Sequence, residues 1–207
     1  MLYSELQCSE AIHKAVERMG FAEMTEIQEK TIPVMLAGHD VIAKAPTGTG
    51  KTCAFGIPVA EHIQPENKYP QAVIMAPTRE LAQQIAEELS NLTYFMPEVQ
   101  VACVYGGANM EKQAKRLAEG CQIVVATPGR LMDHYKHHSI DISHVTQIVL
   151  DEADEMLNMG FYKDVRHIIE MMKARKALSM FSATISREVM DIGWLYQHNA
   201  EEITVQP

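Results

Sequence analysis

The sequence predicts an α/β fold, in which a mostly parallel sheet is covered by helices on both faces. Short runs of apolar residues alternate along the chain with longer stretches whose apolar residues recur at helical spacing. The short runs are almost continuously apolar, which is typical of strands buried on both faces. Polar or glycine-rich segments follow these runs directly, as expected where ligands bind at the carboxyl ends of parallel strands. Together, these observations indicate repeated βαβ units.

The order of the predicted elements supports this fold. The first two are helices over 12–19 and 25–37, and Gly20 and Gly38 mark their ends. Strands are predicted at 40–44, 71–75, 99–105, 122–126, 147–150, 177–181 and 202–205. The intervening helices are predicted at 52–62, at 79–93, from Gly107 to 119, from about 130 onward, at 164–173 and at 187–196.

Length and composition indicate a single folded domain. The chain has 207 residues, of which 47% are hydrophobic and 22% are charged. We expect one domain over 1–207, with 1–38 as a leading region and 39–207 as its core. No apolar run approaches the roughly 18 residues that cross a bilayer, so no membrane association is expected. The four cysteines form no C-x-x-C pair and the N-terminus has no signal-peptide pattern, which favours a cytoplasmic location.

Charge and histidine content narrow the possible functions. The net charge of −9 weighs against a nucleic-acid binder that works through bulk positive charge, so any such contact must come from a local patch or from a part of the protein outside this chain. His134, His137 and His138 lie close together, but the surrounding sequence does not have the ligand spacing of a zinc site. We expect these histidines to form a solvated helix end.

The central motif of the chain is the segment 45–52, between a predicted strand and a predicted helix. It is a P-loop and reads Ala45-Pro46-Thr47-Gly48-Thr49-Gly50-Lys51-Thr52. Its two glycines can adopt positive φ, so that backbone N–H groups converge on an anion at the helix N-terminus. We expect Lys51 to contact the β- and γ-phosphates and the Thr52 hydroxyl to contact Mg²⁺. Ala45 departs from the usual pattern, which begins with glycine.

A second carboxylate-bearing strand is required beside a P-loop. Residues 148–151 are apolar up to Asp151, which is typical of that strand. Asp151 is expected to hold Mg²⁺ through water, because Mg²⁺ keeps several of its waters. Glu152 is expected to orient or deprotonate the attacking water. Two acids at a helix start could also be a solvated, dipole-favoured pair, but the P-loop favours the catalytic role.

The remaining motifs identify a family when they are taken in order. A polar or glycine-containing motif follows each of five other predicted strands. These motifs are 77–82, Gly106 and Gly107, 127–130, 151–154 and 182–184. The chain resembles the N-terminal RecA-like domain of the DEAD-box RNA helicases over 3–205, and the family name spells residues 151–154. In that family a P-loop beginning with alanine is usual.

The resemblance assigns roles to two further sets of residues. The hydroxyls of Ser182 and Thr184 are expected to bond to the 151–154 segment, and these two residues and Asp154 to couple the nucleotide state to RNA unwinding. The segments expected to line an RNA path contribute Pro77, Thr78, Arg79, Gly106, Gly107, Thr127, Pro128, Gly129 and Arg130.

The segment 20–28 resembles the Q motif of the same family. The resemblance implies that Gln28 contacts the adenine edge of ATP, that Phe21 stacks on the base and that Tyr3 is a further upstream aromatic. Met24 stands where proline is commoner. Thr25 and Gln28 also have the spacing of a helix capping box, and one side chain could serve both roles.

The residues themselves give a weaker indication of RNA binding. Arg79 and Arg130 each follow a strand and adjoin small or hydroxyl residues, which suits phosphate contacts. The sequence offers no aromatic platform, so recognition of backbone and 2′-OH with little base preference is expected. With few basic contacts, we expect this chain alone to bind RNA weakly and in a salt-sensitive manner.

The resemblance also implies what completes the activity. A C-terminal RecA-like domain would supply an arginine finger, so that the pair hydrolyses Mg-ATP and unwinds short RNA duplexes or remodels RNA–protein complexes. We expect this chain alone to be monomeric, to bind adenine nucleotide modestly and to hydrolyse it very slowly. An ATP-dependent RNA clamp or scaffold is the alternative. A GTPase is disfavoured, because the only Asn-Lys pair is followed by Tyr69 and Pro70.

Overall fold

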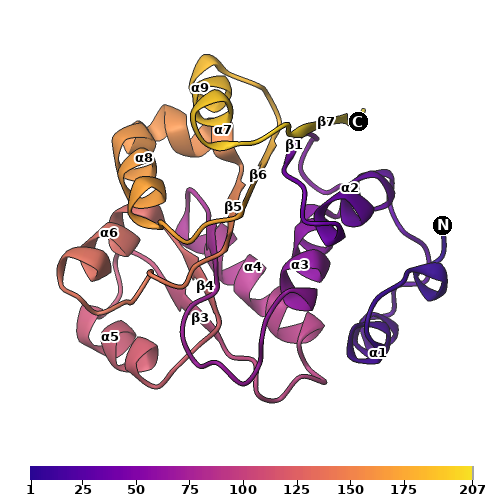
Figure 1. Cartoon of the computed structure of the whole chain (residues 1–207), viewed down its shortest axis with the longest axis horizontal. Coiled ribbons are helices and arrows are strands. Elements are labelled where there is room, and N and C mark those ends of the chain that lie inside the picture. Colours follow the sequence, from indigo (N-terminus) through magenta and orange to yellow (C-terminus); the bar gives the residue numbers. More distant parts are fainter. Residues whose placement is uncertain (207) are drawn as a thin grey trace.

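The computed structural model describes residues 1–206 and contains one seven-stranded sheet in which every paired strand is parallel to its neighbour. The spatial order is β3-β4-β2-β5-β6-β1-β7 (Figure 1). The strands are β1 (Val41–Lys44), β2 (Ala72–Met75), β3 (Val101–Val104), β4 (Ile123–Ala126), β5 (Gln147–Asp151), β6 (Ala177–Ser182) and β7 (Glu201–Thr204). Pro207, the last residue of the expected domain, lies outside the described residues.

Helices cover both faces of this sheet (Figure 1). One layer consists of α1 (Glu10–Arg18), α2 (Glu26–Leu36), α3 (Lys51–Glu61) and α4 (Arg79–Leu92). The other consists of α5 (Met110–Ala118), α6 (Pro128–Lys136), α7 (Ala153–Met156), α8 (Tyr162–Met171) and α9 (Arg187–Tyr196). Two short helices, η1 (Tyr3–Glu5) and η2 (Leu157–Phe161), complete the described secondary structure.

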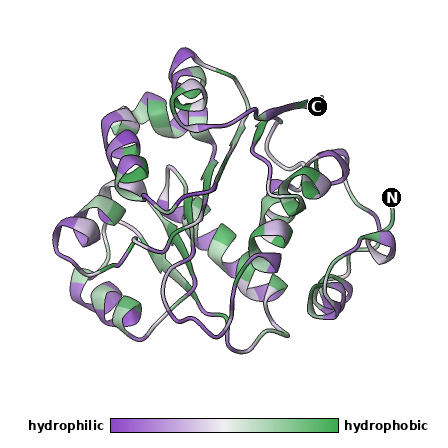
Figure 2. Cartoon of the chain, in the orientation of Figure 1, coloured by the Kyte–Doolittle hydropathy of each residue, from purple (hydrophilic) through white to green (hydrophobic). Residues whose placement is uncertain are grey.

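The sheet is buried from both sides, as the apolar runs predict. Every residue of β2, β4 and β5 is buried. Figure 2 shows hydrophobic colour concentrated in the central strands and mixed colours on the outer helices. The α/β prediction is therefore confirmed, since a parallel sheet needs a helical layer on each face.

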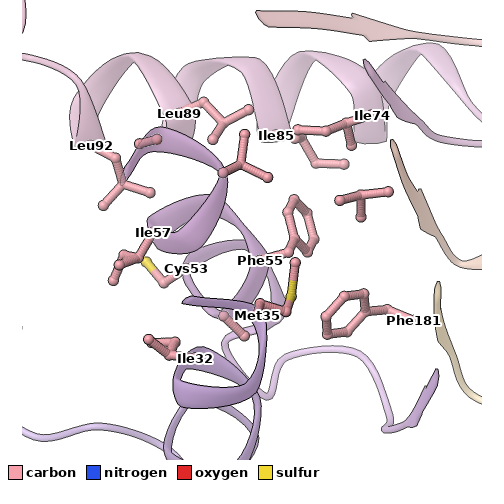
Figure 3. Packing of buried hydrophobic residues seen from close by; sticks show 14 of the residues in the cluster. Ile32, Met35, Cys53, Phe55, Ile57, Ile74, Ile85, Leu89, Leu92 and Phe181 are labelled. Atoms are coloured by element: carbon pink, nitrogen blue, oxygen red, sulfur yellow. The ribbon is translucent and has the colours of Figure 1, made fainter. Parts of the chain in front are cut away.

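The core places α3 against the centre of the sheet. The ring centroids of Phe55 in α3 and Phe181 in β6 lie 5.3 Å apart, and Leu89 and Leu92 of α4 pack against α3 (Figure 3). Gly56 allows this approach, because a Cβ there would lie 2.8 Å from Leu92 Cδ1. The helix that follows the P-loop is thus fixed relative to β6.

The structure differs from the predicted elements in the segment after β5. The short helices α7 and η2 were not expected, and α8 begins at Tyr162 rather than at 164. Gly160 has a φ of +91°, which breaks the helical path between α7 and α8. The helix predicted from about 130 begins at Pro128, because proline fits the first turn of a helix.

The expectation of a solvated histidine cluster is wrong for one of its three members. His137 and His138 are exposed after the end of α6, but His134 is fully buried on the inner side of that helix. Amphipathic spacing determines which side a residue faces, and His134 falls on the same side as Leu131. Within residues 1–206, no helix has the length and apolar character needed to cross a bilayer.

Candidate functional site

The P-loop leaves the sheet at the end of β1 and leads directly into α3. The Ala45 N–H donates to the Ser182 carbonyl oxygen at 2.9 Å, which extends the pairing of β1 with β6. The Thr49 hydroxyl donates to the Pro46 carbonyl oxygen at 2.8 Å and closes the loop on itself. Gly48 and Gly50 have φ of +79° and +85°, as expected for a loop that turns backbone N–H groups inward.

The segment before α2 packs directly on this loop. A Cβ at Gly50 would lie 2.5 Å from Gln28 Nε2 and 3.0 Å from Thr25 Oγ1, so only glycine fits. Gln28 Nε2 donates to the Gly50 carbonyl oxygen at 3.2 Å. Residues 25–28 and the P-loop therefore form one surface, although they are separated in sequence.

Gln28 also forms the capping box that its spacing allows. Its Oε1 accepts hydrogen bonds from the Thr25 N–H, at 3.0 Å, and from the Tyr3 hydroxyl. Tyr3 is buried and contacts the site through its hydrogen bond to Gln28. The Phe21 ring stacks on the Tyr3 ring and is 41% exposed. The capping interpretation is confirmed, and one N–H of the Gln28 amide has no partner within residues 1–206.

A buried ion pair connects the P-loop to β5. Lys51 Nζ lies 3.3 Å from Asp151 Oδ1, and both side chains are buried. Within residues 1–206, Lys51 Nζ has no hydrogen-bond partner. Burial raises the pKa of Asp151, and the Lys51 ammonium opposes this rise. A buried ammonium that lacks hydrogen bonds is suited to an incoming anion.

Glu152 is held in an uncommon backbone conformation at the start of α7. Its φ is +48°, in the left-handed region that non-glycine residues rarely adopt. Burial raises the pKa of Glu152 to about 7, and a hydrogen bond with Glu155 adds to the effect. This pKa is suited to a general base at neutral pH.

Asp154 is bonded to the segment that follows β6. The Thr184 hydroxyl and N–H donate to Asp154 Oδ2 at 2.6 Å and 3.1 Å. The Asp154 N–H donates to Ser182 Oγ at 3.0 Å, and Ser182 Oγ donates to the Thr184 carbonyl oxygen at 2.7 Å. Burial opposes ionisation of Asp154, but hydrogen bonds led by the one from Thr184 outweigh it and lower its pKa.

A polar cleft of about 520 Å³ joins these loops. Thr47, Lys51, Glu152, Asp154 and Thr184 are among its lining residues. Asp151 Oδ1 accepts from the Glu152 N–H at 2.9 Å, while Oδ2 has no hydrogen bond within residues 1–206. Asp151 Oδ2 and the hydroxyl of the half-buried Thr52 are hard oxygen donors, the kind that Mg²⁺ prefers.

The other predicted segments gather at the ends of β2, β4 and β3, which are adjacent in the sheet. The Arg79 guanidinium lies 4.7 Å from the centre of the Tyr105 ring, and a Cβ at Gly107 would lie 3.9 Å from Arg79 Nη1. Thr78 caps α4 by accepting from the Leu81 N–H. Pro77 and Pro128 are buried, whereas Gly106 and Gly107 are exposed.

Arg130 is more enclosed than a solvated arginine. Its side chain is 13% exposed, and Nη1 donates to the Ala108 carbonyl oxygen at 2.9 Å and to Gln113 Oε1 at 3.1 Å. Thr127 and Gly129, at the start of the same helix, are half-buried. Tyr105 and Gln113 thus support both arginines, and no motif in the sequence marks these two residues.

Comparisons with known proteins agree with these motifs. Residues 25–192 match the family model described as DEAD/DEAH box helicase. The chain is 47% identical over 206 residues to the ATP-dependent RNA helicase CshA of Limosilactobacillus reuteri, covering 100% of this chain and 41% of that protein. It is 44% identical over 204 residues to the DEAD-box ATP-dependent RNA helicase CshA of Geobacillus kaustophilus, covering 99% and 44%. The chain therefore spans less than half the length of these curated relatives.

A solved structure extends this likeness to the fold. The crystal structure of a DEAD box protein from Methanococcus jannaschii matches with a TM-score of 0.91 at 39% identity, covering 100% of this chain and 56% of that one. A hypothetical ATP-dependent RNA helicase from Sulfolobus tokodaii matches with a TM-score of 0.88 at 40% identity, covering 95% and 57%.

Proposed function

Because this chain belongs to the DEAD/DEAH box helicase family, we propose that it is the ATP-binding, N-terminal RecA-like domain of an ATP-dependent RNA helicase. The observation that carries the proposal is the order of strands in the sheet. The P-loop, the 182–184 segment and the 151–154 segment follow the adjacent strands β1, β6 and β5. The three segments expected to contact RNA follow the adjacent strands β2, β4 and β3.

The first group of loops supports binding of Mg-ATP. The N-terminus of α3 and Lys51 bind the phosphates, and the amide of Gln28 contacts adenine. Thr52 and Asp151 hold Mg²⁺, with Asp151 acting through water. When bound, the metal stabilises charge that develops on the transferred phosphoryl group.

Glu152 orients or deprotonates the attacking water. It lies at the cleft with Lys51, and its pKa of about 7 lets it be ionised at neutral pH while it can still accept a proton. The left-handed backbone of Glu152 gives its side chain a different direction from that of Asp151 in β5, so the two neighbouring acids have separate roles.

Hydrogen bonds between 151–154 and 182–184 connect two loops of the first group. Asp154 is bonded to both Ser182 and Thr184, so a change at the nucleotide would reach the loop after β6. We propose that the 182–184 segment responds to the nucleotide state and changes the affinity for RNA.

The second group of loops supports contacts with the RNA backbone. Arg79 is exposed, and the N–H groups of Gly106, Gly107 and Gly129 stand near the same edge of the sheet. Such donors bind phosphate and 2′-OH groups without reading bases. The other contributors to this surface are Pro77, Thr78, Thr127, Pro128 and Arg130.

Turnover requires a second RecA-like domain. The curated relatives reported above are more than twice the length of this chain, and P-loop enzymes gain about 10³- to 10⁵-fold in turnover from an arginine finger. We propose that a C-terminal RecA-like domain closes over the cleft and provides that arginine. This chain alone binds nucleotide and hydrolyses it very slowly.

Nucleotide competition tests the proposed ligand. A fluorescent ADP analogue bound to this chain in the presence of Mg²⁺ should be displaced by ATP and poorly by GTP. If GTP competes as well as ATP, the assignment of Gln28 to adenine is wrong. Strand displacement of a short RNA duplex by the whole protein then separates an unwinding enzyme from an ATP-dependent clamp.

A substitution at Lys51 tests the phosphate site. Lys51→Gln should weaken Mg-ADP binding by at least about tenfold, because hydrogen bonds to charged groups contribute roughly 1.5–3 kcal/mol. Lys30→Gln is the matched control, since Lys30 forms an exposed ion pair with Glu26 and should leave affinity unchanged. Equal affinities for wild type and Lys51→Gln, measured by calorimetry, would exclude this site.

A further inference from the structure

A buried hydrogen-bond network connects α5 and α6 beneath the loops that follow β3 and β4. Gln113 of α5 is 8% exposed, and its amide forms three hydrogen bonds. Nε2 donates to the Tyr105 carbonyl oxygen at 3.0 Å. Oε1 accepts from Arg130 Nη1 at 3.1 Å and lies 3.0 Å from His134 Nε2. One side chain therefore connects three segments of the chain.

The chemistry of the partners fixes every donor in this network. A carbonyl oxygen only accepts and a guanidinium only donates, so the Gln113 oxygen must face Arg130. His134 must then donate through Nε2, and in the neutral imidazole Nδ1 therefore carries no proton. That Nδ1 is buried and has no hydrogen-bond partner within residues 1–206. Burial, followed by the charge of Arg130, lowers the pKa of His134, so this histidine is neutral.

The network holds both sides of the turn at Gly106 and Gly107. Tyr105, just before the turn, is bonded to Gln113, and Ala108, just after it, is bonded to Arg130. Two consecutive glycines give the turn intrinsic freedom, and in the folded chain Gly107 is held at a φ of +84°. Arg130 Nε also lies 3.6 Å from Asp133 Oδ2, which is too long for a hydrogen bond, so within residues 1–206 Nε is buried without a hydrogen-bond partner.

We propose that Gln113 is a positioning residue for RNA binding, which acts through Arg130 and holds the Gly106–Gly107 turn and the 127–130 turn in one rigid surface. The inference rests on the proposed function, in which both turns contact the RNA backbone. The ligand class is a single-stranded phosphodiester chain spanning the two turns. Within residues 1–206, Arg130 Nη2 has no hydrogen bond, which leaves a charged donor for a phosphate.

Preorganisation explains why a polar network is used here. An apolar residue at 113 would fill the same space without placing an amide in the interior. A fixed pair of turns spares the ordering cost that a mobile glycine turn would add to each binding event. His134 fits the same account, because it aligns the Gln113 oxygen although its own Nδ1 remains unpaired.

The test uses the whole protein, a labelled single-stranded RNA and a non-hydrolysable ATP analogue. Gln113→Met should weaken RNA binding by about tenfold, the scale of losing a hydrogen bond to a charged group. Affinity for a fluorescent ADP analogue should not change. Because Gln113 acts partly through Arg130 and partly through its own bond to the Tyr105 carbonyl oxygen, the double variant Gln113→Met/Arg130→Ala should lose less RNA affinity than the two single losses combined. Unchanged RNA affinity in Gln113→Met, or full additivity, overturns the proposal.

Two further variants keep the outcome decisive. Gln197→Met removes another amide, bonded to the Val41 and Leu178 carbonyl oxygens near the starts of β1 and β6, and should lower stability without changing RNA affinity. If Gln113→Met does not fold, His134→Leu tests the proposal instead, because it removes only the His134 N–H that is bonded to the Gln113 oxygen. His134→Leu should bind RNA about two- to threefold more weakly, and wild-type affinity overturns the proposal.

Failure of the proposed function gives a different pattern. If wild-type protein does not bind the RNA, or if Arg79→Ala and Arg130→Ala both bind it normally, then these turns are not an RNA surface. If the arginine variants lose affinity while Gln113→Met does not, only the positioning role is wrong.

Discussion

At the residue scale, the site depends on a few positions where backbone and side chain meet closely. Gly50 is the clearest case, since its carbonyl oxygen accepts from Gln28 and its α-carbon faces the same amide. The contact ties the segment before α2 to the phosphate loop. Residues distant in sequence are therefore fixed to each other before any nucleotide binds.

Paired substitutions in the P-loop test this contact. Gly48→Ala should cost about 1–2 kcal/mol of unfolding free energy, the usual cost of a left-handed non-glycine residue, because its Cβ would meet open space. Gly50→Ala should cost clearly more, because its Cβ would also displace Gln28 and Thr25. Urea unfolding of both variants measures the difference, and equal costs would contradict the packing described here.

The pKa of Glu152 makes a prediction for stability against pH. The folded-state pKa is raised from 4.5 to about 7, so the folded state holds a proton that the unfolded state releases. This stabilisation is complete below pH 4.5 and is lost as the pH rises through about 7. The melting temperature of Glu152→Gln should therefore increase relative to wild type over this interval. A constant difference between the two proteins would show that the pKa of Glu152 is not raised.

At the element scale, α3 is the link between the P-loop and the centre of the sheet. Its ring contact to β6 and its close approach to α4 through Gly56 leave little freedom for the start of the helix (Figure 3). Dense packing transmits small shifts rather than absorbing them. Movement of α3 would therefore displace Phe181 and the neighbouring Ser182 at the end of β6.

A double-mutant cycle tests the packing of α3 on α4. Gly56→Ala should destabilise wild type by about 1–3 kcal/mol through overpacking, because its Cβ would lie 2.8 Å from Leu92 and 3.1 Å from Leu89. In a Leu92→Ala background the same change should become stabilising, since it fills space and removes a helical glycine. An effect of the same sign in both backgrounds, measured by urea unfolding, would be incompatible with this contact.

Most of the helices and strands could be predicted from sequence patterns. Continuous apolar runs predicted the seven strands, and helical spacing predicted the helices around them, because each pattern reflects the burial of its own segment. Helices α7 and η2 were missed, since their conformation depends on positive φ at Glu152 and Gly160. His134 was misplaced because the sequence does not show its buried hydrogen-bond partner, Gln113, although its spacing from Leu131 puts it on the inner side of the helix.

At the scale of the whole molecule, the strand order organises the function. The P-loop motif and the residues 151–154 were predictable from local spacing, as was the capping role of Gln28. Their arrangement was not, because strands linked by helices carry no pairing information in their own sequence. The order β3-β4-β2-β5-β6-β1-β7 places the loops proposed to bind nucleotide and the loops proposed to contact RNA in two adjacent groups. Gln113 and Tyr105 lie within the RNA group and have no motif of their own.

The central claim is that this chain forms half of an ATPase site. The most direct measurement is ATP hydrolysis by the 207-residue chain, with and without single-stranded RNA, alongside calorimetry of Mg-ADP binding. We predict Mg²⁺-dependent nucleotide binding, very slow turnover and no acceleration by RNA, because the arginine finger is proposed to come from another domain. RNA-stimulated turnover by this chain alone would contradict the account.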